Sequence, residues 1–267
     1  VNKPDKEPTL EMDLPGYKPR GGGHDRQIQA AAEAINKAKR PLLYVGGGVI
    51  IAEAAGELRA LAAKGKLPVT TTLLGLGAVD EDDDLALKML GMHGTAYANF
   101  AVQECDCLVA VGARFDDRVT GRIDTFAPKA ETIIHIDIDP ASIAKNVEVD
   151  IPVVGDAKHI LARMLEHIHP VDRSAWLAQI AEWKAKYPLR YEHNGLIKPQ
   201  EVVEALGKIT DHDAIVATGV GQHQMWAAQF YGWKRPRQII TSGGLGTMGF
   251  GCPAAIGAAF GNPGRTV

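Results

Sequence analysis

Apolar runs alternate with polar, glycine-rich turns along most of this chain, which is typical of an α/β protein. Short runs rich in β-branched residues predict strands, and they fall at 42–45, 69–72, 107–111, 132–137 and 153–154. Between them apolar residues recur at helical spacing, as over 52–63. Strands that are apolar throughout and interleaved with helices predict a parallel sheet covered on both faces.

Two aspartates mark expected helix starts. Asp25 and Asp156 each stand before a stretch whose apolar residues keep helical spacing. Aspartate is a favoured N-cap residue because its carboxylate accepts a hydrogen bond from a free backbone N–H of the first turn. We therefore expect each of them to cap a helix.

The pattern divides the chain into four parts. Prolines and a closing glycine triplet predict an extended linker over 1–23. A first domain, a Rossmann-like six-stranded parallel sheet, is expected over 24–169, followed by a connector helix within 170–193. A second α/β domain begins in 194–267, with strands at 214–218 and 238–241. The chain stops where another strand starts, so we expect a fragment of a longer protein.

Composition narrows the class of protein. The 267 residues are 46% hydrophobic and 23% charged, with a net charge of -3, which describes a globular protein and argues against nucleic-acid binding. No apolar run is long enough to cross a bilayer, so no membrane partner is expected. Cys105, Cys107 and Cys252 are an odd number without metal-ligand spacing, which favours a reducing compartment. We expect Cys105 and Cys107 to be inert buried thiols.

Glycine clusters follow several predicted strands. Ligands of open parallel sheets bind at the carboxyl ends of the strands, and Gly46-Gly47-Gly48 follows the first strand. Such a turn can cradle a pyrophosphate. It does not match the G-x-G-x-x-G fingerprint, however, and the next strand ends in threonines where a dinucleotide site needs an acid. A purely structural turn is the equal alternative.

Charged residues follow the strand at 107–111. The string GARFDDRVTG, residues 112–121, carries two arginines and two aspartates, and the planar guanidinium suits phosphate or flavin carbonyl oxygens. A solvated salt-bridge loop is the alternative. Asp137 or Asp139 could bind ribose hydroxyls or simply cap a turn. His93, between glycines, could be a general base, but a packing or ligand-contacting role is favoured because nothing nearby in the sequence orients it.

Six strings taken together identify a family resemblance. VGGG, TTTLLGLG, LGMHG, GARFDDRVTG, GVGQHQMW and TSGGLGTMGFG occur in this order, and over about 14–267 the chain closely resembles the catalytic subunits of acetolactate synthase (acetohydroxyacid synthase). That family consists of thiamine-diphosphate enzymes of branched-chain amino-acid biosynthesis. The resemblance implies that this chain is the central FAD-binding domain and the first part of the diphosphate-binding domain.

The resemblance also implies two sets of site residues. FAD would contact Gly46, Gly47, Gly48, Thr72, Leu73, Leu90, Gly91, Met92, His93, Gly112, Ala113, Arg114, Asp116, Arg118, Val119, Asp137, Ile138, Asp156 and Ala157. Thiamine diphosphate would contact Val220, Gly221, Gln222, His223, Gly246 and Met248. The catalytic set would be Gly246, a backbone acceptor for the cofactor's amino group, Met248, a wedge beneath the bent cofactor, and Gln222. Leu74 departs from the glutamine that is common in the family, which leaves a flavin contact there open.

The activity implied is decarboxylation of pyruvate and condensation with pyruvate or 2-ketobutyrate. The magnesium ligands and the catalytic glutamate are expected outside this segment, and the segment alone is expected to be inactive. A homodimer or tetramer with a regulatory small subunit is implied, in the cytoplasm or in an organelle stroma or matrix. The alternatives are a sibling enzyme, pyruvate oxidase or glyoxylate carboligase, and a non-catalytic nucleotide-binding module. GARFDDRVTG and LGMHG favour the synthase.

Overall fold

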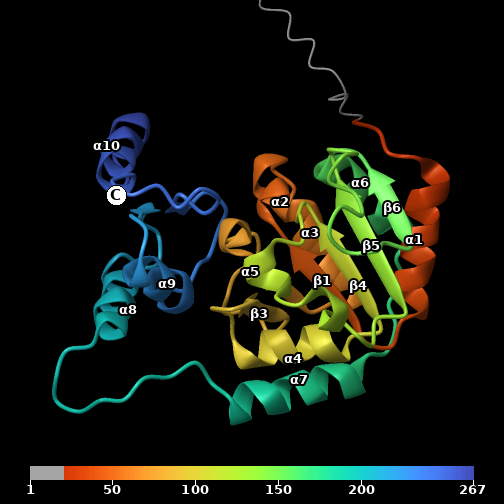
Figure 1. Ribbon diagram of the computed structural model, residues 1–267, viewed down its shortest axis with the longest axis horizontal. Helices are drawn as coiled ribbons and strands as arrows, with labels where there is room; N and C mark the ends of the chain where they lie inside the picture. The colour runs from red at the N-terminus through yellow and green to blue at the C-terminus, as the bar shows by residue number, and fades with distance from the viewer. Residues whose placement is uncertain (1–20) are drawn as a thin grey trace, which may run out of the picture.

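The computed structural model describes residues 21–267. They form two α/β units, an N-terminal unit from α1 to α7 and a C-terminal unit from α8 to α10, joined by an irregular segment after α7 (Figure 1). The linker predicted at 1–23 lies almost entirely outside the described residues.

The N-terminal unit is built on a six-stranded parallel sheet in the order β3-β2-β1-β4-β5-β6. The strands are β1 (Pro41–Val45), β2 (Val69–Thr71), β3 (Ala86–Met89), β4 (Cys107–Val111), β5 (Thr132–Asp137) and β6 (Ile151–Val154). The predicted Rossmann-like sheet is thereby confirmed. The chain runs outward from β1 to β3 and then returns to β4 beside β1, so the strand order reverses between β1 and β4. Ligands of such sheets bind in the crevice at that reversal.

Helices cover both faces of this sheet (Figure 1). One layer contains α1 (Asp25–Lys37), α3 (Ala55–Gly65) and α6 (Ala157–His167), and the other contains α4 (Ala96–Glu104) and α7 (Ser174–Lys186). The short helices α2 (Gly47–Ile51) and α5 (Asp117–Thr120) and the 3-10 turns η1 (Leu73–Gly75) and η2 (Ile123–Thr125) lie in the connections.

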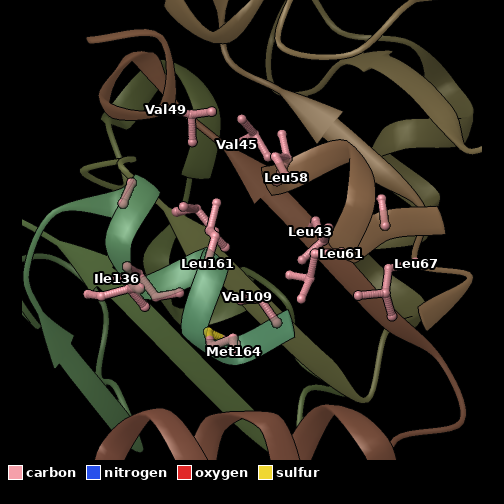
Figure 2. Close-up of a cluster of buried hydrophobic side chains, with 14 of the residues drawn as sticks. Leu43, Val45, Val49, Leu58, Leu61, Leu67, Val109, Ile136, Leu161 and Met164 are labelled. Carbon is pink, nitrogen blue, oxygen red and sulfur yellow. The ribbon is translucent and has the colours of Figure 1, made fainter. Parts of the chain in front are cut away.

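Successive side chains of β1 point to opposite faces of the sheet, so they enter two separate hydrophobic cores. Leu43 and Val45 face the layer that contains Leu58 and Leu161 (Figure 2), whereas Tyr44 faces the opposite layer. All of these side chains are fully buried. Burying a leucine stabilises the fold by about 1.5–3 kcal/mol, so each face anchors β1 firmly and the loop after it starts from a rigid strand.

Three local predictions need correction. The sixth strand, β3, was not located in the sequence. The helix expected over 52–63 is present as α3 but begins at Ala55, and a separate short helix, α2, precedes it, because Glu53 between them has φ 53° and breaks the helical path. Asp25 does not cap α1, since His24 takes the N-cap position and Asp25 pairs with Arg163 instead. The prediction for Asp156 is confirmed: it caps α6 by accepting the amide of His159.

The C-terminal unit is smaller. It contains α8 (Pro199–Ile209), β7 (Val216–Ala217), α9 (Gln222–Phe230), β8 (Ile239–Ile240) and α10 (Gly251–Gly261), with β7 and β8 paired in parallel. Both strands are shorter than the predicted 214–218 and 238–241. No helix in the part of the chain that the structure describes is long and apolar enough to span a membrane.

A separate apolar cluster joins the two units. Leu76 and Met89 of the N-terminal unit pack with Ala228, Tyr231 and Trp233 of the C-terminal unit, and Trp233 is completely buried. This contact fixes the carboxyl ends of the two sheets relative to one another, and these ends carry the candidate site.

Candidate functional site

The loops after β1 and β4 meet at the reversal of strand order. The amide of Gly46 donates to the carbonyl of Val111 at 2.9 Å, and the amide of Gly48 donates to Gly112 at 3.0 Å. A Cβ on Gly46 would lie 2.1 Å from the Gly112 oxygen. These glycines are therefore required for close backbone approach, and they sit at the crevice where a dinucleotide would bind.

Arg114 leaves this crevice with its guanidinium exposed. It forms an ion pair with Asp116 at 3.2 Å, and the side chains are 66% and 47% exposed. The solvated salt bridge that was the alternative interpretation of this loop is therefore present. Such exposed ion pairs contribute at most about 1 kcal/mol to the free energy of folding. The guanidinium is thus accessible to an anionic or carbonyl ligand at little energetic cost. Asp116 also begins α5 as its N-cap residue.

The LGMHG loop docks onto the loop after β4. The amide of Met92 donates to the Arg118 carbonyl at 2.9 Å, and the Arg118 guanidinium lies 3.7 Å from the Met92 sulfur. Asn99 holds Gly91 by hydrogen bonds to its amide and carbonyl at 2.9 and 3.0 Å. Residues implied as flavin contacts by two separate strings are therefore brought together. His93 is exposed, and its carbonyl accepts from Gln229 at 2.8 Å.

Asp137 ends β5 at the same edge of the sheet. Its Oδ1 accepts the amide of Asp139 at 2.9 Å, so the turn-cap role is present. Next to it, Asp156 and Ala157 begin α6, and the Gly155 amide donates to the Asp137 carbonyl at 2.9 Å. The implied ribose contact at Asp137 stays a prediction.

The remaining implied flavin contacts lie around the same carboxyl edge. Thr72 follows β2 as the N-cap of η1 and accepts the Gly75 amide, and Leu73 begins that turn. Leu90 is buried directly after β3, whereas Ile138 is exposed directly after β5. The others are Gly47, which begins α2, Ala113, which follows Gly112, and Val119, which lies in α5.

His135 was missed by the sequence reasoning. It is fully buried on β5, and its Nε2 lies 2.9 Å from the Ala113 carbonyl, so Nε2 carries the proton. Its ring meets the Phe115 ring edge-on at 5.0 Å. Burial lowers the pKa of His135 and keeps it neutral. The side chain thus supports the turn that presents Arg114.

The second glycine-rich pair of loops follows β7 and β8. Gly221 is the N-cap residue of α9, and Gly246 has φ 63°, a conformation that favours glycine. A Cβ on Gly246 would lie 3.7 Å from a methyl of Val220, so the two loops converge. Met248 is 87% exposed, and Gln222 and His223 are exposed in the first turn of α9. All six residues implied as thiamine diphosphate contacts lie on these loops or in the first turn of α9.

Leu74 lies between the two sets of loops. A Cβ on Gly47, after β1, would be 3.0 Å from the Leu74 Cβ, and a Cβ on Gly243, after β8, would be 2.9 Å from a Leu74 methyl. Leu74 is thus a spacer between the crevice of the first sheet and the loops of the second. The two candidate cofactor regions are neighbours.

Two other kinds of reactive site are a free thiol and a metal centre. Cys105 and Cys107 are buried, as predicted, and burial raises the pKa of Cys107 to about 12, which disfavours the reactive thiolate form. Among residues 21–267, no three His, Cys, Asp or Glu side chains cluster in a way that could hold a metal ion.

Glycine turns at the reversal of a Rossmann-like sheet, beside a second pair of glycine loops, are typical of proteins that bind cofactors through their diphosphate groups. The model of the thiamine pyrophosphate enzyme central domain matches residues 28–164, and that of the C-terminal TPP binding domain matches residues 219–267. The chain belongs to the thiamine pyrophosphate enzyme family.

Its relatives point to one branch of that family. The acetolactate synthase large subunit of Corynebacterium glutamicum is 51% identical over 264 residues, which is 96% of this chain and 42% of the relative. A probable acetolactate synthase large subunit of Methanocaldococcus jannaschii is 51% identical over 95% of this chain and 44% of its own length. The mitochondrial acetolactate synthase catalytic subunit of Saccharomyces cerevisiae is 50% identical over 89% of this chain and 37% of its own length. The chain thus spans less than half the length of these relatives.

Proposed function

We propose that the natural protein carrying this sequence is an acetolactate synthase. It would decarboxylate pyruvate and condense the product with pyruvate or 2-ketobutyrate, giving acetolactate or acetohydroxybutyrate for branched-chain amino-acid biosynthesis. The observation that carries the proposal is the identity of about half of all residues, over 95–96% of the chain, with synthase large subunits of a bacterium and an archaeon.

FAD would lie across the crevice between β1 and β4. The glycine turns at Gly46–Gly48 and Gly112 leave the strand ends free of side chains, and the exposed Arg114 offers charged donors there. The position of these features at the reversal of strand order, where ligands of such sheets bind, supports a flavin dinucleotide there. The flavin would be bound, but the proposed reaction would require no redox step from it.

Thiamine diphosphate would lie against the loops after β7 and β8. When bound, it supplies the nucleophilic carbon that attacks the keto carbon of pyruvate. The chain's task is to hold and bend it: the Gly246 carbonyl would accept from the amino group, Met248 would fill the space beneath the bend, and Gln222 would lie beside them at the start of α9. Val220, Gly221 and His223 would complete the contacts. Magnesium would bind through ligands other than the described residues.

We also propose that the chain consists of a central domain at 24–169, a connector at 170–193 and the beginning of a diphosphate-binding domain at 194–267. A homodimer or tetramer is proposed, and the name "large subunit" borne by the relatives supports a regulatory small subunit. A cytoplasmic location, or an organelle stroma or matrix, is part of the same proposal, and the yeast relative's name includes the word mitochondrial.

The test is a product assay on the natural protein carrying this sequence, supplied with thiamine diphosphate, Mg²⁺ and FAD. Pyruvate should be converted to acetolactate, and omission of thiamine diphosphate should abolish the product. Pyruvate consumption with hydrogen peroxide and no acetolactate would identify an oxidase instead. Condensation of glyoxylate but not pyruvate would identify a carboligase of the other kind, and cofactor binding without turnover of either acid would identify a non-catalytic module.

A further inference from the structure

The two loops of the C-terminal unit are held together by very little backbone pairing. Strands β7 and β8 are two residues each, and beyond them the Thr218 amide donates to the Ile240 carbonyl at 3.0 Å. A parallel pair of this length does not by itself fix the geometry of the loops that follow. Within the described residues, side-chain interactions therefore add to the backbone pairing that sets the spacing between residues 219–223 and 242–248.

A partly buried side-chain network lies at that point. The hydroxyls of Thr218 and Thr241 are 2.7 Å apart, and the Gln224 Nε2 donates to the Thr241 hydroxyl oxygen at 2.7 Å. Thr218 and Gln224 are each 5% exposed, and Thr241 is half-buried. Thr241 is thus the shared member, since it accepts from Gln224 on α9 while one hydroxyl proton lies between the two threonines.

The three residues tie together every element that carries an implied thiamine diphosphate contact. Thr218 immediately precedes the loop that ends at Gly221, Gln224 stands in the first turn of α9 beyond Gln222 and His223, and Thr241 immediately precedes the loop that carries Gly246 and Met248. Rotation of α9 or sliding of β8 would stretch one of these 2.7 Å hydrogen bonds and leave Thr218 or Gln224, which are buried, without a partner, and an unpaired buried polar group is costly.

We propose that Thr241, with Gln224 and Thr218 as its partners, is the positioning residue that sets the two thiamine diphosphate loops at the correct separation. The inference rests on the proposed function, because it assigns the network to the cofactor site of that function. None of the three side chains is assigned a contact with the cofactor. Their effect is exerted through the loops they join.

The experiment compares variants in the natural protein carrying this sequence. Thr241→Val removes the hydroxyl and keeps the volume, Gln224→Leu removes the donor, and Thr241→Ser keeps the hydroxyl and removes the methyl group. Thr210→Val is the matched control: its hydroxyl also bonds within the C-terminal unit, to the Leu206 carbonyl at 2.8 Å, but at the end of α8 that precedes β7. Dissociation constants for thiamine diphosphate with Mg²⁺ and for FAD are measured by titration calorimetry, beside kcat and KM for pyruvate.

Thr241→Val and Gln224→Leu should each raise the thiamine diphosphate dissociation constant about tenfold and lower kcat, with FAD affinity unchanged. The double variant should be no worse than either single one, because both break the same network. Thr241→Ser should stay within about twofold of the unmodified protein. Thr210→Val should lower the melting temperature and leave the cofactor affinity unchanged.

Two results would overturn the inference alone: thiamine diphosphate affinity and kcat of Thr241→Val equal to those of the unmodified protein, or a Thr241→Ser variant as impaired as Thr241→Val, which would show a packing role. Failure of the unmodified protein to bind thiamine diphosphate would overturn the proposed function as well. The two failures are thus distinguished by the unmodified protein.

Discussion

Glu81 and Trp233 exchange hydrogen bonds in both directions across the contact between the two units. The Glu81 amide donates to the Trp233 carbonyl at 3.0 Å, and the Trp233 amide donates to the Glu81 carboxylate at 3.2 Å. The same carboxylate lies 3.5 Å from the Lys88 ammonium, and its other oxygen is buried without a partner. Burial raises the pKa of Glu81 to about 7.

This buried carboxyl predicts a pH-dependent stability. Its folded pKa of about 7 is above the reference value of 4.5, so the folded state binds the proton more tightly. The contribution of Glu81 is fully present below the lower value and is lost as the pH rises through the higher one, by on the order of 3 kcal/mol. Glu81→Gln should therefore raise the melting temperature near pH 8 and change it little near pH 5, as measured by calorimetry.

The control for this prediction is Glu33→Gln, an exposed carboxyl on α1, which should shift neither melting temperature. Lys88 keeps access to water after the substitution, because its side chain is 27% exposed and its ammonium lies 3.4 Å from the Gln229 carbonyl. A Glu81→Gln effect of the same size at both pH values would show that the charge of Glu81 is not responsible.

The close approach of the turns at Gly46 and Gly112 predicts that two glycine-to-alanine substitutions differ greatly in their effect on stability. A Cβ on Gly46 would lie 2.1 Å from the Gly112 oxygen and 2.7 Å from the Ala113 Cα, and backbone atoms cannot move aside as a flexible side chain can. Gly46→Ala should therefore destabilise the N-terminal unit by about 3 kcal/mol. Gly56→Ala, in α3 with no atom within 4 Å of the new Cβ, should stabilise it by about 0.5–1 kcal/mol.

Urea denaturation of both variants measures these changes. Equal stabilities for the two variants would mean that β1 and β4 do not approach as closely as the glycines indicate. Loss of FAD affinity in Gly46→Ala without loss of stability would instead assign the glycine to the ligand.

The sequence was informative where one physical signal was sufficient. β4 and β5 have the predicted bounds, because an apolar run of five or six residues between turn residues has few other interpretations. β3 was missed because its four residues include Lys88, whose φ is 58°, and its register with β2 is irregular. Lys88 is tolerated there because Glu81 lies beside it, and that pairing is not visible in a local pattern.

The residues of the candidate site could likewise be predicted only where a local pattern marks them. The glycine and arginine loops were found, since their composition alone marks them. His135 and Gln224 were not, because each is a single polar residue whose partner is distant in the chain, Ala113 for one and Thr241 for the other. Only the fold brings these pairs together.

Arg114 provides a test of the flavin assignment. Arg114→Ala in the natural protein should weaken FAD binding by about 1.5–3 kcal/mol, because a charge-assisted hydrogen bond is lost and the glycine turns cannot replace it. Arg122→Ala is the control, since Arg122 is also exposed and paired with an aspartate two residues away, Asp124. Flavin fluorescence titration measures both. Equal affinity for the two variants would remove Arg114 from the site.

Substitution of Met248 distinguishes a role in cofactor geometry from a role in cofactor affinity. Its side chain is 87% exposed on the loop after β8, where it packs against little of the described chain and is available as the wedge. Met248→Ala should lower kcat by up to about 100-fold, because small errors in position are costly to rate, while thiamine diphosphate affinity should fall much less. Leu245→Ala is the matched control, an apolar residue 95% exposed on the same loop, and it should retain its kcat. If turnover of Met248→Ala survives while the cofactor dissociation constant rises steeply, Met248 is a binding residue and not a wedge.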